Sequence, residues 1–277
     1  MKQGKRFIAP GTWFAMTYPA DWVEAEGEEG TFLFYNPEHW TGNLRLSAYR
    51  GPTMGYGRQV VREELRANPS ALAVRLGTLD CAYSREMMQE GGDWYTSHLW
   101  VVALGDMAVE CTFTVARGMP VDEAEGVIAS LEPRRPGTRY PAEVIPIRLS
   151  EIAAIDEAYD WTKATVKEAL RRDLQGEEED IDWMQQLADS GRLNPKKREP
   201  WTALGITLCT LIANGLEGWE WRTLVDGNRE VPVLEQTGTG RIVDPMKLVW
   251  SRVKAGEPVR LAEAFDTAID GEVEPGG

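Results

Sequence analysis

Two histidines, His39 and His98, are the side chains of this chain best suited to proton transfer near neutral pH. A serine- or cysteine-based catalytic triad would have to use one of them. His39 lies in an expected turn beside Trp40, and no acidic residue stands at a spacing that the sequence ties to it. His98 lies in the middle of an expected strand. Neither position predicts a catalytic centre, so we assign no catalytic residue.

His98 allows two interpretations. Alternation along the strand places it on one face with three neighbours, namely Trp94, Thr96 and Trp100. This face is either a semi-polar aromatic binding surface or a sheet face covered by a helix, with His98 hydrogen-bonded at its rim. Aromatic side chains on strands usually pack, which favours the covered face.

Metal ligands are equally sparse. Cys81, Cys111 and Cys209 lack the spacing of a zinc site or of a disulfide framework, and their odd number fits a reducing compartment. The acidic run over residues 177–182 lacks the glycine-containing loop of an EF-hand. Acidic residues before a helix are explained by the helix dipole. We therefore expect no metal site.

Cofactor and nucleophile motifs are missing from the sequence as well. Residues 238–241, Gly-Thr-Gly-Arg, lack the Lys-Ser/Thr ending of a phosphate loop. No Gly-x-Gly-x-x-Gly follows an expected strand, and no Gly-x-Ser-x-Gly occurs. Pairs such as Glu217 and Glu220 arise by chance among 44 acidic residues. We expect no cofactor.

The composition is that of a globular protein, with 277 residues, 43% hydrophobic and 27% charged. The formal net charge of −14 is uneven: residues 1–140 carry 14 basic and 18 acidic side chains (−4), and residues 141–277 carry 16 and 26 (−10). This balance argues against nucleic acid and anionic membranes as partners and suits a basic protein. The N-terminus has no apolar signal segment, and the uncharged run over residues 201–216 is too short to span a bilayer. We expect a cytoplasmic protein.

The elements expected in the first half are mostly strands, which alternate apolar and polar residues between turn signals. They cover residues 5–9, 13–18, 31–35, 43–49, 73–88 with a break at Gly77, 94–104 and 107–115. Two helices, residues 56–67 and 120–131, accompany them. An antiparallel sheet with flanking helices, an α+β sandwich, follows from this order. The Pro- and Gly-containing segment 132–137 is the expected linker, so we place the domains at residues 1–136 and 137–277.

The second half reads as a smaller α+β domain with helices and one β-hairpin. The expected helices cover residues 152–174, 181–187, 201–214, 245–253 and 261–269. Strands at residues 219–225 and 230–236 form a hairpin around Asp226-Gly227-Asn228. The charge-free helix over residues 201–214 must lie at the centre of a packed core. Residues 144–148 form a strand that pairs with either domain.

The N-terminal order of elements resembles the PsbP-like fold. Tyr18, Pro19 and Trp22 carry this resemblance as a Tyr-Pro-x-x-Trp element, together with residues 44–47 and the helix at residues 121–131. The fold includes an extrinsic photosystem subunit and a Ran-binding nuclear transport factor. Its members mostly bind other proteins and lack active sites, so the resemblance implies an interaction role and transfers no catalytic residue.

The C-terminal half resembles a bacterial domain of unknown function that follows such a module. The matching residues are Trp201-x-x-Leu204-Gly205, Gly218-Trp219-Glu220-Trp221, Asp226-Gly227 and Asp244-Pro245. The two resemblances together imply a two-domain bacterial protein of unknown function.

Tryptophans supply the candidate partner-binding residues. Among the 11 tryptophans, Trp40, Trp94, Trp183 and Trp219 lie near turns or charged neighbours. Exposed tryptophan is enriched in interface hot spots, although partial burial under a loop would explain the same positions. We expect these four to mark a partner surface.

The function expected from these observations is a non-enzymatic protein-interaction module of a bacterial cytoplasm. It would present an aromatic patch within an acidic surface to a basic or amphipathic protein. An immunity-type protein and a chaperone of a secreted effector are roles of this kind. The alternative is a small-molecule binder or hydrolase with a cleft between the domains, where His98 or an acid near Asp226 would act.

Overall fold

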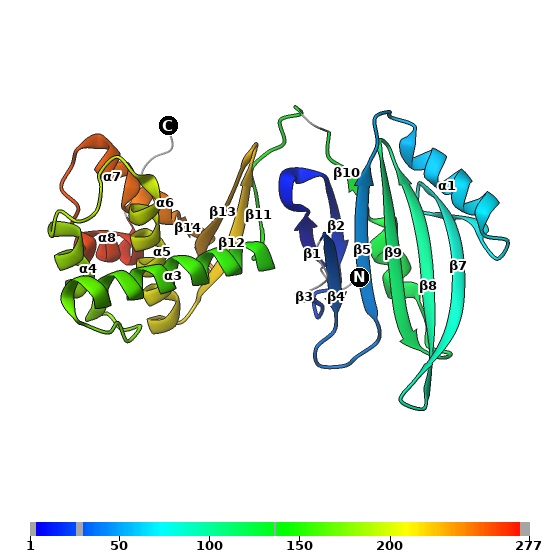
Figure 1. The fold of residues 1–277 in the computed structure, drawn as a ribbon, viewed down its shortest axis with the longest axis horizontal. Coiled ribbons are helices and arrows are strands. Elements are labelled where there is room, and N and C mark those ends of the chain that lie inside the picture. The colour runs from blue at the N-terminus through cyan, green and yellow to red at the C-terminus, as the bar shows by residue number, and fades with distance from the viewer. Residues whose placement is uncertain (1–3, 26–29, 136, 272–277) are drawn as a thin grey trace. The chain divides into compact units, whose positions relative to one another are not determined.

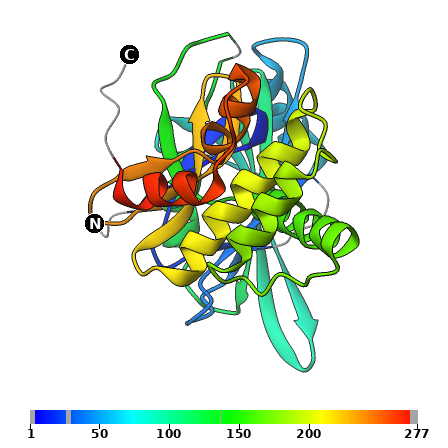
Figure 2. The ribbon, with the colours of Figure 1, turned by 90° about the vertical axis from the view of Figure 1, so that its left-hand side faces the viewer.

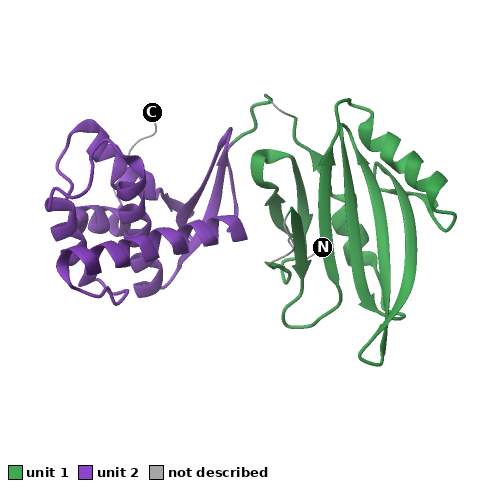
Figure 3. Ribbon diagram, in the orientation of Figure 1, with its two compact units in different colours: residues 1–141 green, residues 142–277 purple. Residues whose placement is uncertain are grey.

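The computed structural model describes residues 4–25, 30–135 and 137–271. The chain divides into two compact units, residues 1–141 and 142–277 (Figure 3). This division lies five residues after the expected boundary at residue 136. Pro136 of the expected linker is outside the described residues.

The first unit contains a seven-stranded antiparallel sheet and a three-stranded one (Figure 1). The strand order is β3-β4-β5-β9-β8-β7-β6 in the large sheet and β1-β2-β10 in the small one. The strands are β1 (Lys5–Ile8), β2 (Phe14–Tyr18), β3 (Val23–Ala25), β4 (Thr31–Tyr35), β5 (Asn43–Arg50), β6 (Leu72–Leu76), β7 (Leu79–Glu90), β8 (Asp93–Leu104), β9 (Met107–Ala116) and β10 (Glu132–Pro133). The unit also contains a 3-10 turn, η1 (Pro10–Thr12), and the helices α1 (Tyr56–Ala67) and α2 (Asp122–Ala129).

The core of this unit lies between the small sheet with α2 on one side and the large sheet on the other. Phe7 of β1 meets Phe34 of β4 edge-on, with 5.1 Å between the ring centroids. Trp22 stacks on Phe113 of β9 at 6.2 Å. Apolar side chains at alternate positions of β5, β8 and β9 complete the layer. The PsbP-type Tyr18 and Trp22 are therefore core residues.

Helix α1 covers the opposite face of the large sheet. Val61 packs on Ala82 of β7 and Val101 of β8 in a separate small cluster. Gly57 lets the first turn of α1 lie directly on the sheet, since a Cβ there would be 2.1 Å from the Met107 carbonyl oxygen. One helix covers only part of this face, so the rest of it carries half-buried or exposed side chains, many of them polar, such as Ser84, Ser97 and Thr112.

The second unit packs helices against a four-stranded antiparallel sheet of order β11-β12-β13-β14. Its strands are β11 (Glu143–Pro146), β12 (Trp219–Asp226), β13 (Arg229–Gln236) and β14 (Arg241–Val243). Its helices are α3 (Leu149–Leu170), α4 (Asp180–Asp189), α5 (Arg198–Gly215), α6 (Pro245–Leu248), α7 (Trp250–Ala255) and α8 (Leu261–Asp270). Figure 2 looks onto these helices, with α8 in red.

Helix α5 is the centre of the second core, as its charge-free segment predicts. Leu204, Leu208 and Ile212 are completely buried at helical spacing. Gly205 allows close contact with α6, because a Cβ at this position would be 2.1 Å from the Pro245 carbonyl oxygen. A substitution here would have to push two helices apart.

The α+β class, the flanking helices and the smaller C-terminal unit with its hairpin are confirmed. The sequence analysis missed β3, β10 and β14, which are two or three residues long. Strand β10 lies within the expected linker, where Glu132 pairs with Ala15 of β2. A contact between residues so distant in sequence leaves no local pattern, and Pro133 argues locally against a strand.

Candidate functional site

The hairpin of β7 and β8 is the longest among the described residues, and its end extends beyond the rest of the large sheet (Figure 1). Gly91 and Gly92 form its turn with φ values of 59° and 98°. Two consecutive positive φ angles are typical of a type I′ turn, whose twist matches that of the two strands. Every residue from Arg85 to Trp94 is exposed. The hairpin end therefore stands clear of the core.

Large apolar side chains gather at this end. Met87 is 60% exposed, Trp94 46%, Trp40 43% and Met88 38%. Strand alternation puts Met87 and Trp94 on the face of the large sheet that carries Trp100, whereas Met88 lies on the α1 face. Both faces of the hairpin end thus expose an apolar surface, which we call the hairpin-end patch: Met87, Met88 and Trp94.

Trp40 extends this patch on the α1 face. Its ring meets Tyr95 edge-on with 6.0 Å between centroids, and its Nε1 donates to Asn43 Oδ1 at 2.7 Å. The loop before it is ordered by Asn36, whose Oδ1 accepts from the backbone N–H of His39 at 3.0 Å. Trp40 is therefore held in one orientation while its outer face stays in solvent.

The hairpin end is acidic. Residues 85–94 contain three carboxylates, Glu86, Glu90 and Asp93, and one guanidinium, Arg85. Among the residues that the structure describes, none of the three carboxylates forms an ion pair. Their charge is therefore available to a partner.

A hollow of about 370 Å³ lies on the α1 face of the large sheet, beyond the C-terminal end of α1. Half-buried Ser84, Ser97 and Thr112 line it from three adjacent strands, with Leu99 between Ser84 and Thr112. Its remaining lining residues are Asn68, Ser70, Arg85 and Glu86. The hollow is thus lined mainly by uncharged polar groups.

His98 lies on the opposite face of the large sheet and is buried. Its ring stacks on Trp100, and its Nδ1 is hydrogen-bonded to the Tyr83 hydroxyl at 2.8 Å. Burial lowers the pKa of His98 below the ordinary value of 6.5, and the charge of Arg85 lowers it further. His98 thus packs at the rim of the core with a phenol as its partner, which fits the covered face rather than the aromatic binding surface.

The described residues offer no exposed thiol nucleophile and no cluster of metal ligands. The three cysteines are buried free thiols, and burial raises the pKa of Cys81 to about 11. Asp180, in the acidic run, accepts the backbone N–H groups of Gln175 and Gly176 at 2.8 and 2.7 Å. No group of three potential metal ligands occurs within the described ranges.

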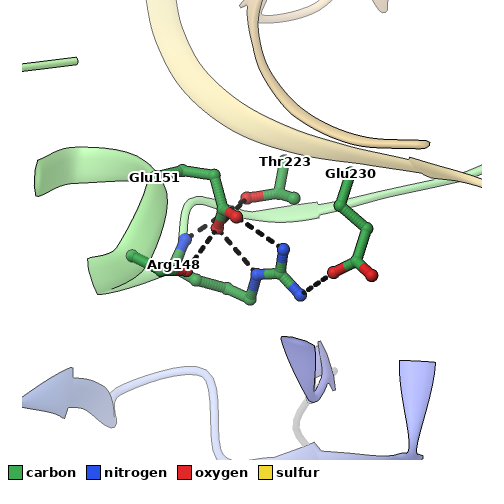
Figure 4. A network of polar contacts seen from close by, with 5 residues as sticks. Arg148, Glu151, Thr223 and Glu230 are labelled. Atoms are coloured by element: carbon green, nitrogen blue, oxygen red, sulfur yellow. Dashed lines mark hydrogen bonds and ion pairs between the residues drawn. The ribbon is translucent and has the colours of Figure 1, made fainter. Parts of the chain in front are cut away.

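A buried ion-pair network joins the start of α3 to the second sheet (Figure 4). Arg148, only 1% exposed, donates from Nε and Nη2 to both carboxylate oxygens of Glu151, at 2.7 and 2.6 Å. Its Nη1 lies 2.8 Å from Glu230 of β13, and the Thr223 hydroxyl of β12 donates to Glu151 at 3.3 Å. The carboxylates raise the pKa of Arg148 above its ordinary value despite burial. Every charge has a partner, so the network is structural.

The four candidate tryptophans do not form one surface. Trp40 and Trp94 lie at the same end of the first unit's large sheet. Trp183 is half-buried in the second unit, with the Arg172 guanidinium 4.5 Å from its ring centroid. Trp219, expected to be exposed, is only 7% exposed because it begins β12 on the core side and lies under Arg241.

The sequence did not predict that Met87 and Met88 are exposed. An available signal was the hairpin turn at Gly91-Gly92 combined with strands longer than their neighbours. That length places residues of both strands beyond the layer that covers the core. Methionine in a strand pattern reads as core, and only the sheet topology shows that it is not.

A family model described as a domain of unknown function, DUF3805, matches residues 2–156, and a second, DUF3806, matches residues 180–265. A crystal structure from Bacteroides thetaiotaomicron VPI-5482 is 56% identical, with a TM-score of 0.94 over 98% of this chain and 100% of that one. None of the curated proteins compared matches this chain. These findings confirm the resemblance to a two-domain bacterial protein of unknown function.

Two solved structures align with about half of the chain. The PsbP protein of Synechocystis sp. PCC 6803 is 12% identical over 48% of this chain and 94% of that one, with a TM-score of 0.26. LpqN of Mycobacterium tuberculosis, described as involved in cell envelope biogenesis, is 14% identical over 47% of this chain and 84% of that one, with a TM-score of 0.29. At these TM-scores the likeness carries no argument about function. None of the described helices combines the length and apolar character needed to cross a membrane.

Proposed function

We propose that this chain, which belongs to the DUF3805 family of unknown function, is a protein-interaction module whose docking surface is the hairpin-end patch. The exposure of Met87, Met88 and Trp94 at the end of one projecting hairpin carries the proposal. Tryptophan is enriched in interface hot spots, and methionine adapts to partner surfaces of varied shape. Exposed apolar side chains that gather in one place mark interaction sites more often than scattered ones do.

The charge around the patch indicates the chemistry of the partner. Glu86, Glu90 and Asp93 surround the apolar side chains with unpaired negative charge. A partner segment that combines apolar side chains with Lys or Arg would bury the patch and neutralise these carboxylates. Opposite charge also accelerates encounter, so the association rate would fall as salt is raised.

A role without catalysis agrees with the surroundings of His98. A hydrolase of the kind considered as the alternative needs a histidine within reach of a carboxylate. His98 is bonded to Tyr83 instead and faces the core. Immunity-type binding and effector chaperoning are both roles of a docking protein, and buried free thiols suit the reducing bacterial cytoplasm.

Comparative capture tests this function. The full chain is immobilised and exposed to extract of the cells in which it occurs, in parallel with the variant Met87→Ala/Trp94→Ala. The control variant is Leu72→Ala on β6, because Leu72 is 61% exposed and lies outside the patch. We expect a protein that the wild type and the control retain and that the double variant loses by about tenfold or more. Equal recovery by all three chains, measured by quantitative mass spectrometry, would contradict the proposal.

A further inference from the structure

The hollow beside the end of α1 has features that the docking function does not use. We infer that it binds a small, uncharged, polyhydroxylated molecule such as a monosaccharide or an alditol. This inference goes beyond the proposed function and concerns a neighbouring surface: Ser84, Ser97 and Thr112 are not part of the hairpin-end patch, and Glu86 is the one lining residue that the docking proposal also uses.

The hollow presents a set of three hydroxyl groups to a ligand. Ser84, Ser97 and Thr112 come from β7, β8 and β9, and all three lie on the α1 face. Within the described part of the chain, their hydroxyl groups have no hydrogen-bonding partner. A hydroxyl both donates and accepts, so an array of three matches a ligand whose own groups do the same.

The size of the hollow and its apolar residue Leu99 also suit a small ligand. The volume of about 370 Å³ lies within the range of about 300–1,000 Å³ that is typical of small-molecule sites. Leu99 lies between Ser84 and Thr112 and packs against the α1 cluster, so it offers a fixed apolar patch to the C–H face of a sugar ring. A polar rim around a small apolar floor fixes the orientation of such a ligand.

The charge around the hollow disfavours an anion. Glu86 is the charged side chain of the lining on this face, because strand alternation places the Arg85 side chain on the opposite face with His98. The C-terminal end of α1 faces the hollow with Asn68 and Ser70, and the negative end of the helix dipole disfavours an anion. The carboxylate of Glu86 and the negative end of the helix disfavour a phosphate or a carboxylate, and the hydroxyl groups favour a neutral polar ligand.

The test is an NMR titration of the full chain with a panel of glucose, galactose, mannose, N-acetylglucosamine, glycerol and inositol. We expect saturable shifts of the amide signals of Ser84, Ser97 and Thr112 with at least one compound. Removal of one hydroxyl group, in Thr112→Val or Ser97→Ala, should weaken this binding about three- to tenfold. Ser47→Ala, on the same face of β5 but outside the lining, should leave the binding unchanged.

Two results would overturn the inference. One is the absence of saturable shifts with every compound of the panel. The other is binding that is weakened equally, or not at all, by Thr112→Val, Ser97→Ala and Ser47→Ala. Thermal unfolding curves must show that all three variants are folded. Neither result affects capture through Met87 and Trp94, so failure of this inference and failure of the docking function are distinguishable.

Discussion

Arg148 shows how one residue connects segments that are distant in sequence. Its guanidinium neutralises Glu151 in α3 and Glu230 in β13, and it does so with almost no contact with solvent. The desolvation of such a group is costly, and the hydrogen bonds to both carboxylates offset that cost. Loss of the guanidinium alone would leave two carboxylates in a poorly solvated place.

We predict that Arg148→Met lowers the free energy of unfolding of the second unit by about 3–5 kcal/mol, because it leaves buried charge unpaired. The double variant Arg148→Met/Glu151→Leu should recover part of this loss. Denaturant unfolding measures the change, and hydrogen exchange of the β12 amides localises it to the second unit. A loss below about 1 kcal/mol for the single variant would mean that the carboxylates reach water.

His98 predicts a pH dependence with a definite sign. Its pKa in the folded chain is lowered, so the unfolded chain takes up the proton first as the pH falls. The stability contribution is therefore complete above the unfolded value of 6.5 and is lost as the pH falls toward the folded pKa. Between about pH 7 and pH 5, the free energy of unfolding of the first unit should therefore fall less in the His98→Gln variant than in the wild type.

The matched control for this pH series is His39→Gln, since His39 lies in an exposed turn. Glu110 and Glu125, whose pKa values burial raises, are present in all three chains and cancel in the comparison. Parallel pH curves for the wild type and His98→Gln would contradict the assignment of a buried neutral imidazole.

At the scale of elements, two helical glycines in the first unit test how closely helices approach their surroundings. Gly57 of α1 lies where a Cβ would be 2.1 Å from the Met107 carbonyl oxygen, whereas nothing lies within 4 Å of the Cβ position of Gly126 in α2. We predict that Gly57→Ala destabilises the first unit by about 1–3 kcal/mol. Gly126→Ala should stabilise it by about 0.5–1 kcal/mol, because alanine loses less backbone entropy.

Thermal and denaturant unfolding of these two glycine variants gives the comparison. The change in the free energy of unfolding should have opposite signs for Gly57→Ala and Gly126→Ala, although both are the same substitution in helices of one unit. Equal effects would show that the contact of α1 with the sheet does not depend on the missing side chain.

Strand β11 and the start of α3 are matched by the DUF3805 model, yet they belong to the second compact unit. Ile145 of β11 is buried there, and β11 pairs with β12. We predict that a fragment of residues 142–277 folds cooperatively and that residues 157–277 do not. Near-ultraviolet circular dichroism of the tryptophans distinguishes them, and a native spectrum from the shorter fragment would contradict the prediction.

Sequence patterns predicted elements well where local chemistry decides. The helix at residues 56–67 agrees with α1 at both ends, because amphipathic spacing and flanking turn residues define it. The hairpin around Asp226-Gly227 is likewise a local feature. Contacts between distant residues decide three other features: the pairing of β11, the strand β10 and the Arg148 network. No pattern within a single sequence encodes such contacts.

The candidate site was predicted only in part. Tryptophan near a turn correctly indicated exposure for Trp40 and Trp94, but the same reasoning failed for Trp219. Which face of β12 packs on the helices depends on the register with β13, and that register is a property of the folded sheet. The hydroxyl groups of the hollow come together only when three strands pair in register. The order of residues along the chain therefore does not predict the hollow.

At the scale of the whole molecule, the chain combines two separately packed cores with a surface of strongly negative net charge. The hairpin-end patch belongs entirely to the first unit, and the buried ion-pair network belongs to the second. We therefore propose that docking belongs to the unit of residues 1–141. The second unit carries the larger share of the negative charge.

Photo-crosslinking in living cells tests the docking claim most directly. A photoreactive phenylalanine analogue replaces Trp94 in one chain and Leu72 in another, both of them exposed positions in the first unit. We expect a discrete crosslinked protein from position 94 and none from position 72. No crosslinked protein at position 94, or the same product from both positions, would contradict it.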